Sequence, residues 1–177
     1  MKRIGVDPGL QGALALLNDN LELIEVVDMP VMAMGKHKNQ VNSAELGKLL
    51  SRWHSQKGAV TVYLEAVHSM PGQGVSACFN FGDSFGCIRG VCGALQIPIV
   101  LVTPQSWKKR AGLLNKPKDY ARTLAQQLYP SAELGRKKDI GRADAILIAR
   151  YGTPPHIELE VFNISEMIRA GHLTNMH

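Results

Sequence analysis

The order of the apolar segments constrains the fold of this chain more than any other feature. Residues 2–7, 12–17 and 21–27 each have the composition of a short strand, and Asp7-Pro8-Gly9 gives a strong turn signal after the first of them. Short turns join antiparallel neighbours, whereas parallel neighbours need a long crossover. The sequence therefore predicts a sheet that begins with a three-stranded antiparallel meander.

Helix and strand patterns alternate through the rest of the chain. Ser43 is the expected N-cap of a helix whose apolar positions include Leu46 and Trp53, and residues 30–42 before it have the composition of a loop. The remaining predicted elements are strands at 59–65 and 97–102 and helices at 75–95, 104–110, 117–129 and 142–151. This order predicts an α/β fold with three antiparallel strands followed by two parallel ones, flanked by helices.

We expect one domain over residues 1–152, because 177 residues with 45% hydrophobic content suit a single core. The pair Pro154-Pro155 breaks the helical pattern, so residues 153–177 are expected to form a tail with at most one short helix near 165–170. Within the helix predicted at 75–95, Gly82, Gly86 and Gly90 recur every four residues and form a ridge without side chains. That ridge fits either close packing on the chain's own sheet or a dimer contact.

Three carboxylates occupy positions that normally exclude them. Asp7 and Glu65 each end an apolar strand, and Asp144 shares a helix face with apolar residues such as Leu147 and Ile148. Each has a simpler explanation: a turn-capping Asp, an exposed charge at a strand end, and an outward-pointing Asp in the first helical turn. Together, however, acids from two strands and a late helix can converge at one edge of a sheet.

Such a cluster predicts a divalent-metal site. Hard carboxylate oxygens suit Mg²⁺ or Mn²⁺. Two ions about 4 Å apart would hold a scissile phosphate, activate a water and stabilise the leaving oxygen. The expected chemistry is therefore phosphodiester hydrolysis.

A basic segment points to a polyanionic partner. The chain has 20 Lys and Arg against 15 Asp and Glu, a formal charge of +5, and much of the excess lies in Lys108, Lys109, Arg110, Lys116, Lys118 and Arg122. Nucleic acid would match this distribution, although a solvated basic face gives the same pattern. The three cysteines lack C-x-x-C spacing, and no apolar run approaches the length of a membrane helix, so we expect a soluble protein of the cytoplasm.

The residues singled out above resemble the RuvC family of Holliday junction resolvases. The resemblance rests on Ile4-Gly5-Val6-Asp7-Pro8-Gly9, Leu64-Glu65 and Ala143-Asp144-Ala145, with Asn80 to Gly90 and Val102-Thr103-Pro104 similar to the family's glycine-rich helix and following strand. It covers about residues 1–152 and implies a ribonuclease H-like fold, a homodimer built on the glycine-rich helix, and a crossover junction endodeoxyribonuclease that nicks opposed strands. It also implies Mg²⁺ dependence, with Mn²⁺ as a substitute, and no nucleotide cofactor.

The resemblance also implies roles for further residues. Metal and catalysis fall to Asp7, Glu65 and Asp144, with Asp139 assisting, and DNA contacts fall to His68, Lys108, Lys109, Lys116, Lys118 and Arg122. Two positions depart from the family. A second Asp often precedes the helical one by three residues, where this chain has Gly141, so Asp139 serves only if the helix begins after it. His68 stands where the family commonly has an aromatic wedge, and phage-encoded relatives that cut branched DNA are a suitable comparison.

Two other functions fit parts of the same pattern. A catalytically inactive nucleic-acid-binding module would keep the fold without cutting, and an RNA-processing nuclease would use the same acids on another polymer. Actin-like ATPases and sugar kinases also begin with a strand, Asp and Gly, but they need two such domains around a nucleotide. A length of 177 residues supplies one.

Overall fold

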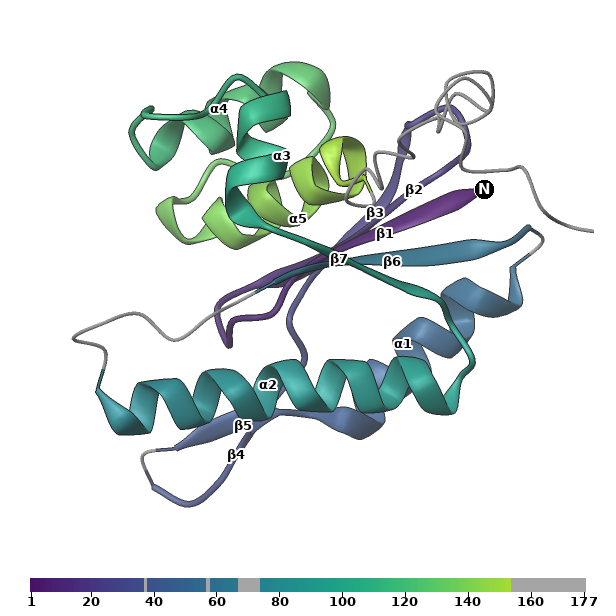
Figure 1. Ribbon diagram of the computed structural model, residues 1–177, viewed down its shortest axis with the longest axis vertical. Coiled ribbons are helices and arrows are strands. Elements are labelled where there is room, and N and C mark those ends of the chain that lie inside the picture. The colour runs from purple at the N-terminus through teal and green to yellow at the C-terminus, as the bar shows by residue number, and fades with distance from the viewer. Residues whose placement is uncertain (37, 57, 67–73, 154–177) are drawn as a thin grey trace, which may run out of the picture.

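The computed structural model describes residues 1–36, 38–56, 58–66 and 74–153. A five-stranded mixed sheet lies between two layers of helices (Figure 1). Its five strands are β1 (Lys2–Asp7), β2 (Ala13–Leu17), β3 (Leu23–Asp28), β6 (Val60–Glu65) and β7 (Ile99–Val102), in the order β3-β2-β1-β6-β7. The pairs β1–β2 and β2–β3 are antiparallel, whereas β1–β6 and β6–β7 are parallel. The predicted meander followed by two parallel strands is thus confirmed.

The helices divide between the two faces of the sheet. α1 and α2 cover one face, and α3, α4 and α5 cover the other (Figure 1). Their bounds are α1 (Ser43–Ser55), α2 (Val75–Ala94), α3 (Pro104–Arg110), α4 (Asp119–Leu128), a 3-10 turn η1 (Lys137–Asp139) and α5 (Ile140–Tyr151). Each face of the sheet therefore buries its own apolar core, as expected for a sheet whose central strands are buried on both sides. None of the described helices is long and apolar enough to cross a membrane.

Contacts between β1 and α5 fix the position of the late helix. A methyl group at Gly5 would collide with the backbone of Ala145 and Ala149, so the helix lies directly on the strand. Arg3 donates from Nε to the carbonyl oxygen of Ala149 at 2.5 Å and from its terminal nitrogen to that of Gly152, while its guanidinium stacks on Tyr63 with 3.9 Å to the ring centroid. The first strand and the last described helix are thus held together by close backbone packing at Gly5 and by the hydrogen bonds of the Arg3 side chain.

The structure differs from the sequence predictions at three places. Residues 30–42 are not a plain loop, because β4 (Val31–Ala33) and β5 (Asn39–Val41) form a small antiparallel hairpin. The cap of α1 is Asn42 rather than Ser43: the Asn42 side chain accepts from the Glu45 N–H at 3.2 Å. α5 begins at Ile140, two residues before the predicted start. The expected short helix at 165–170 lies outside the described residues.

Candidate active site

Asp7 and Glu65 lie side by side at one edge of the sheet. The parallel register of β1 and β6 pairs Val6 with Leu64, so the next residue of each strand, Asp7 and Glu65, stands at the carboxyl end. Both side chains are half-buried. The turn-capping explanation for Asp7 holds as well, because its Oδ1 accepts from the Gly9 N–H at 3.3 Å. The turn thus orients the carboxylate without removing it from the site.

Asp144 approaches the same edge from α5. It is half-buried in the segment that packs against β1, directly before Ala145, and it does not point outward into solvent. Burial, followed by the negative charges of Asp7 and Glu65, raises the pKa of Asp144 to about 7. Burial also raises the pKa values of Asp7 and Glu65, and the charge of Asp7 adds to the effect on Glu65. The three predicted acids therefore form one electrostatically coupled group.

Positive charge and hydrogen bonds partly offset this repulsion. Lys108 lowers the pKa of all three acids, and Lys118 lowers those of Asp7 and Asp144. The Trp107 indole donates from Nε1 to Oε1 of Glu65 at 2.8 Å, a contact that sequence reasoning missed. A buried indole needs an acceptor, but the sequence offers no sign of which acceptor that is.

The donor set fits a divalent cation, although its ligands are not pre-arranged. Among the described residues, no group of three or more His, Cys, Asp or Glu side chains is placed to hold a metal ion as it stands. Three half-buried carboxylates with raised pKa values are nevertheless a costly arrangement unless a positive charge joins them. Their hard oxygens match the preference of Mg²⁺ and Mn²⁺, so the chemistry of the residues is compatible with such an ion.

Asp139 does not join the other three acids. It is buried directly before α5, where its carboxylate accepts from the Arg136 backbone N–H at 2.7 Å and from the Arg136 guanidinium at 2.7 to 3.2 Å. These hydrogen bonds lower the pKa of Asp139, opposite to the shift of the clustered acids. α5 begins at Ile140, so Asp139 lies before the helix as the sequence required, but Arg136 holds its carboxylate.

Gly141 occupies the position where the family resemblance leads one to expect a second Asp. It lies one helical turn before Asp144, and a methyl group there would collide with the Gln11 carbonyl oxygen and approach the Gly12 Cα to 2.9 Å. The turn between β1 and β2 therefore fills the space that a side chain at position 141 would need.

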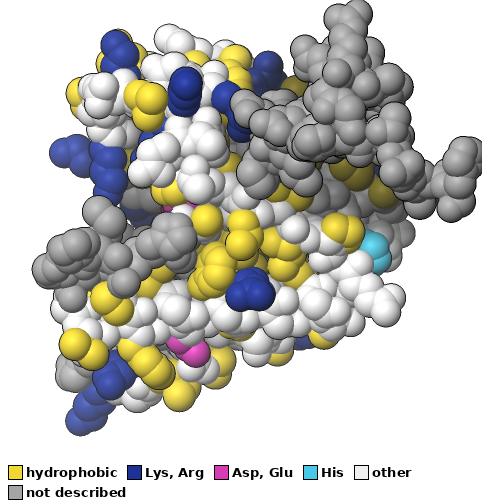
Figure 2. Space-filling view, in the orientation of Figure 1, with side chains coloured by type: hydrophobic (Ala, Val, Ile, Leu, Met, Phe, Trp, Pro, Cys, Tyr) yellow, Lys and Arg dark blue, Asp and Glu magenta, His cyan; other side chains and the backbone are white. Residues whose placement is uncertain are grey.

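The predicted DNA-contacting residues that the structure describes fall into three groups. Lys108, Lys116 and Lys118 line a small cavity of about 80 Å³ together with Asp144, which places them beside the acids. Lys109 is exposed on α3. Figure 2 shows Lys and Arg side chains gathered in the region of α3 and α4. Arg122 is occupied, since it pairs with Asp119 at 2.8 Å and donates to the Leu134 carbonyl oxygen at 3.0 Å. His68 lies outside the described residues.

Comparisons with known proteins agree with this geometry. No family model matches the chain. It is 34% identical over 92 residues to the chloroplastic Holliday junction resolvase MOC1 of Chlamydomonas reinhardtii, a match that covers 50% of this chain and 10% of that relative.

Two solved structures of Thermus thermophilus RuvC share the fold. One, a complex with a Holliday junction substrate, has a TM-score of 0.60 at 17% identity and covers 84% of this chain and 90% of its own. The other has a TM-score of 0.54 at 16% identity and covers 97% of both chains. The protein therefore has the ribonuclease H-like fold in the form that RuvC has, and half of its sequence is similar to that of a Holliday junction resolvase.

Proposed function

We propose that this protein is a metal-dependent, structure-selective endonuclease that hydrolyses phosphodiester bonds in Holliday junctions or other branched DNA. The observation that carries the proposal is the coupling of Asp7, Glu65 and Asp144 at one edge of a RuvC-like sheet. A fold alone does not define an activity. Here the clustered carboxylates could hold a metal ion and the adjacent lysines could bind phosphates, which together favour cleavage of a polyanion.

Asp7, Glu65 and Asp144 would hold the ion, Mg²⁺ in the first instance with Mn²⁺ as a substitute. A bound divalent cation neutralises charge on the scissile phosphate and lowers the pKa of a water nucleophile. The chain's own contribution is to keep three carboxylates close together in a half-buried site, with Asp7 oriented by the Gly9 N–H and Glu65 by the Trp107 indole. Asp139 has no part in this assignment, since its carboxylate is committed to Arg136.

The lysines beside the acids would bind the DNA backbone. Lys108, Lys116 and Lys118 surround the cavity that contains Asp144, so a phosphate bound by them is next to the carboxylates. The positive charges of Lys108 and Lys118 also lower the pKa of Asp144, which offsets part of the repulsion among the acids. Lys109 extends this surface along α3, whereas Arg122 supports the Asp119 end of α4.

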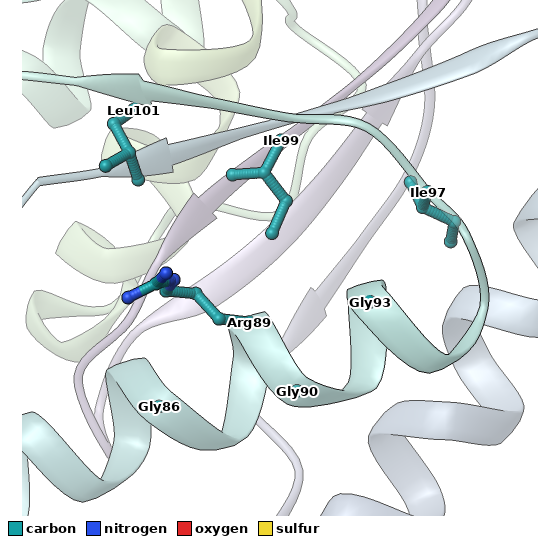
Figure 3. Close-up of a pocket in the computed structure, with 7 residues that line it drawn as sticks. All are labelled: Gly86, Arg89, Gly90, Gly93, Ile97, Ile99 and Leu101. Carbon is teal, nitrogen blue, oxygen red and sulfur yellow. The ribbon is translucent and has the colours of Figure 1, made fainter.

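A second copy of the chain is the partner that we propose for the glycine ridge of α2, defined as Gly82, Gly86, Gly90 and Gly93. A methyl group at any of these glycines meets no atom within 4 Å in the described chain, so close packing on its own sheet does not explain them. An open groove of about 590 Å³ runs between this ridge and the edge strand β7. Figure 3 shows Ile99 and Leu101 pointing from β7 toward α2, from which Arg89 extends. Leu101 is 45% exposed, so this face offers apolar area to a partner.

A cytoplasmic location is also part of the proposal. Its support is the cysteine usage: three cysteines without C-x-x-C spacing suit a reducing compartment better than a disulfide-rich one.

The test is a cleavage assay on a synthetic four-way junction, run beside duplex, flap and RNA substrates with Mg²⁺ or EDTA. Wild-type protein should nick the junction only with Mg²⁺. Asp7→Asn should bind the junction as wild type does but cut it at least a hundredfold more slowly. The matched control is Asp19→Asn, an exposed acid that pairs with the chain's amino group and should cut normally.

The same assay separates the alternatives. Cleavage by Asp7→Asn at the wild-type rate contradicts the proposed site. Junction binding without Mg²⁺-dependent cleavage by the wild type identifies an inactive binding module, and preferential cutting of the RNA substrate identifies an RNA-processing nuclease.

A further inference from the structure

Trp107 is a buried residue whose polar atom reaches the candidate site. Its side chain is fully buried, and its Nε1–H donates to Oε1 of Glu65 at 2.8 Å. The two residues are 42 positions apart in sequence, so this contact depends on the tertiary fold. Among the described residues it is the side-chain donor that holds the Glu65 carboxylate.

Local structure fixes where this indole lies. Val102, the last residue of β7, pairs in register with Glu65. Thr103 then caps α3, accepting from the Ser106 N–H at 3.2 Å, and Pro104 begins the helix. Trp107 comes one turn later and belongs to the buried core that the sheet shares with α5. A ring set in that core has little freedom to turn, so the direction of its N–H is fixed.

The chemistry of this contact differs from that of a lysine or arginine contact. An indole N–H is a donor that carries no charge and is not lost at physiological pH. It restrains one carboxylate oxygen and favours the charged form of Glu65, yet it brings no cation that would compete with a metal ion. Oε2 accepts no hydrogen bond from the described residues and is left for a ligand. Outer contacts of this kind typically set the orientation of metal-binding carboxylates.

Trp107 also connects to the lysine beside it. The Lys108 ammonium lies over the Trp107 ring, 5.2 Å from its centroid, and the same lysine lowers the pKa of Asp7, Glu65 and Asp144. One short helix therefore supplies both a neutral donor to Glu65 and a positive charge to the whole group.

We propose that Trp107 is a positioning residue that holds Glu65, through one oxygen, in the orientation required to bind the divalent cation. The inference rests on the proposed function and deepens it, since it assigns the support of the metal site to a residue that makes no contact with the ion itself.

The chain contains its own control for this inference. It has two tryptophans, and the other one, Trp53, also donates from Nε1 to a glutamate: Oε2 of Glu25 at 2.8 Å. Glu25 is paired with Arg52 of α1 at 2.9 Å, and Trp53 belongs to the core on the opposite face of the sheet. The two indoles thus make the same bond, but only one of the two glutamates belongs to the acidic cluster.

The first experiment is a Mg²⁺ titration of ¹⁵N-labelled wild-type protein, followed by NMR. The indole N–H resonance of Trp107 should move with the same saturation curve as the backbone amides of Asp7 and Asp144, and that of Trp53 should stay in place. If the amide shifts of Asp7 and Asp144 change on Mg²⁺ addition while the Trp107 indole shift does not, the inference is overturned and the proposed function stands. If the amide shifts of Asp7 and Asp144 do not change either, both are overturned.

The second experiment compares Trp107→Phe with Trp53→Phe in Mn²⁺ binding by calorimetry. Trp107→Phe should weaken Mn²⁺ affinity roughly 10- to 100-fold, the usual effect of losing such an outer contact, while Trp53→Phe leaves it unchanged. Equal affinities for Trp107→Phe and wild type overturn the inference, as does an equal loss in both variants. Circular dichroism checks that each variant folds, and if Trp107→Phe does not fold, the titration of the wild type decides.

Discussion

Gly141 faces the backbone of the turn between β1 and β2, one helical turn before Asp144. A side chain at this position would meet the Gln11 carbonyl oxygen, so the chain has no room there for the second Asp that the family resemblance leads one to expect. Asp139 does not replace it, because two groups of Arg136 hold its carboxylate. The acidic group of this protein therefore contains three side chains, and the backbone of the β1–β2 turn occupies the space that a fourth would need.

Gly141→Asp tests this account at the residue scale. The added side chain should force the turn or the helix to move, lowering the free energy of unfolding by about 1–3 kcal/mol, the usual cost of overpacking, with no gain in cleavage. Gly135→Asp is the matched control, because a side chain at that exposed glycine meets open space. Urea denaturation measures the stability, and faster cleavage at unchanged stability would show that a fourth acid fits after all.

Sequence reasoning found the acids and the lysines beside them, but not the side chains that form hydrogen bonds with the acids. Asp7, Glu65 and Asp144 stand out because each interrupts an apolar pattern, and the parallel register brings the first two together. Trp107 has no such signal, since a buried Trp fits any core and its acceptor is set only by tertiary structure. The pairing of Asp139 with Arg136 depends on where α5 begins. The ends of helices are difficult to locate from sequence to within one or two residues.

The glycines of α2 lie on an exposed face of the helix that packs against no other described element. Its glycines leave a ridge without side chains that faces open space, next to the unpaired edge of β7. An unpaired edge strand beside apolar side chains is a surface that proteins normally cover. Figure 2 shows apolar side chains gathered in the middle of this face of the molecule.

Gly90→Leu should convert the proposed dimer to a monomer. The new side chain has space within its own chain, so the fold should survive, but it fills the groove that a second copy would enter. Ser51→Leu, which adds the same side chain to the exposed face of α1, should leave the dimer intact. Sedimentation velocity distinguishes the two, and a monomeric wild type or a dimeric Gly90→Leu would contradict the role of the ridge.

The larger elements were predictable, whereas the small ones were not. Long apolar patterns located the five strands of the main sheet and the five helices to within a few residues. The hairpin of β4 and β5 was missed because each strand has only three residues, too few for a periodic signal, and pairing rather than propensity stabilises it. The cap of α1 was displaced by one residue because Asn42 and Ser43 are both good caps.

Across the whole molecule, acidic and basic side chains lie together at one end of the sheet. Three acids with raised pKa values lie beside Lys108, Lys116 and Lys118, whereas α1, in the opposite layer, carries ion pairs such as Lys48 with Glu45. A polyanion would bind where the positive charge is not already neutralised by its own side-chain partners. The orientation of bound DNA would then follow from the position of these lysines.

Salt dependence measures this arrangement. The affinity for a four-way junction should fall steeply with salt, and Lys108→Ala and Lys118→Ala should each reduce the slope of log K against log salt by about 0.9, the value for one phosphate contact. Lys48→Ala, on α1, is the control and should leave the slope unchanged. Equal slopes for all four proteins would place the DNA elsewhere.

The bonds from Arg3 to the carbonyl groups of Ala149 and Gly152 have a consequence for synthesis of the chain on the ribosome. Asp7 emerges among the first residues, but its partner Asp144 belongs to a helix that docks on the first strand only when residues near 150 are available. An unfinished polypeptide therefore carries the acids separately, without a shared centre. Under the proposed function, the ability to cut nucleic acid would appear only once residues near 150 have been translated.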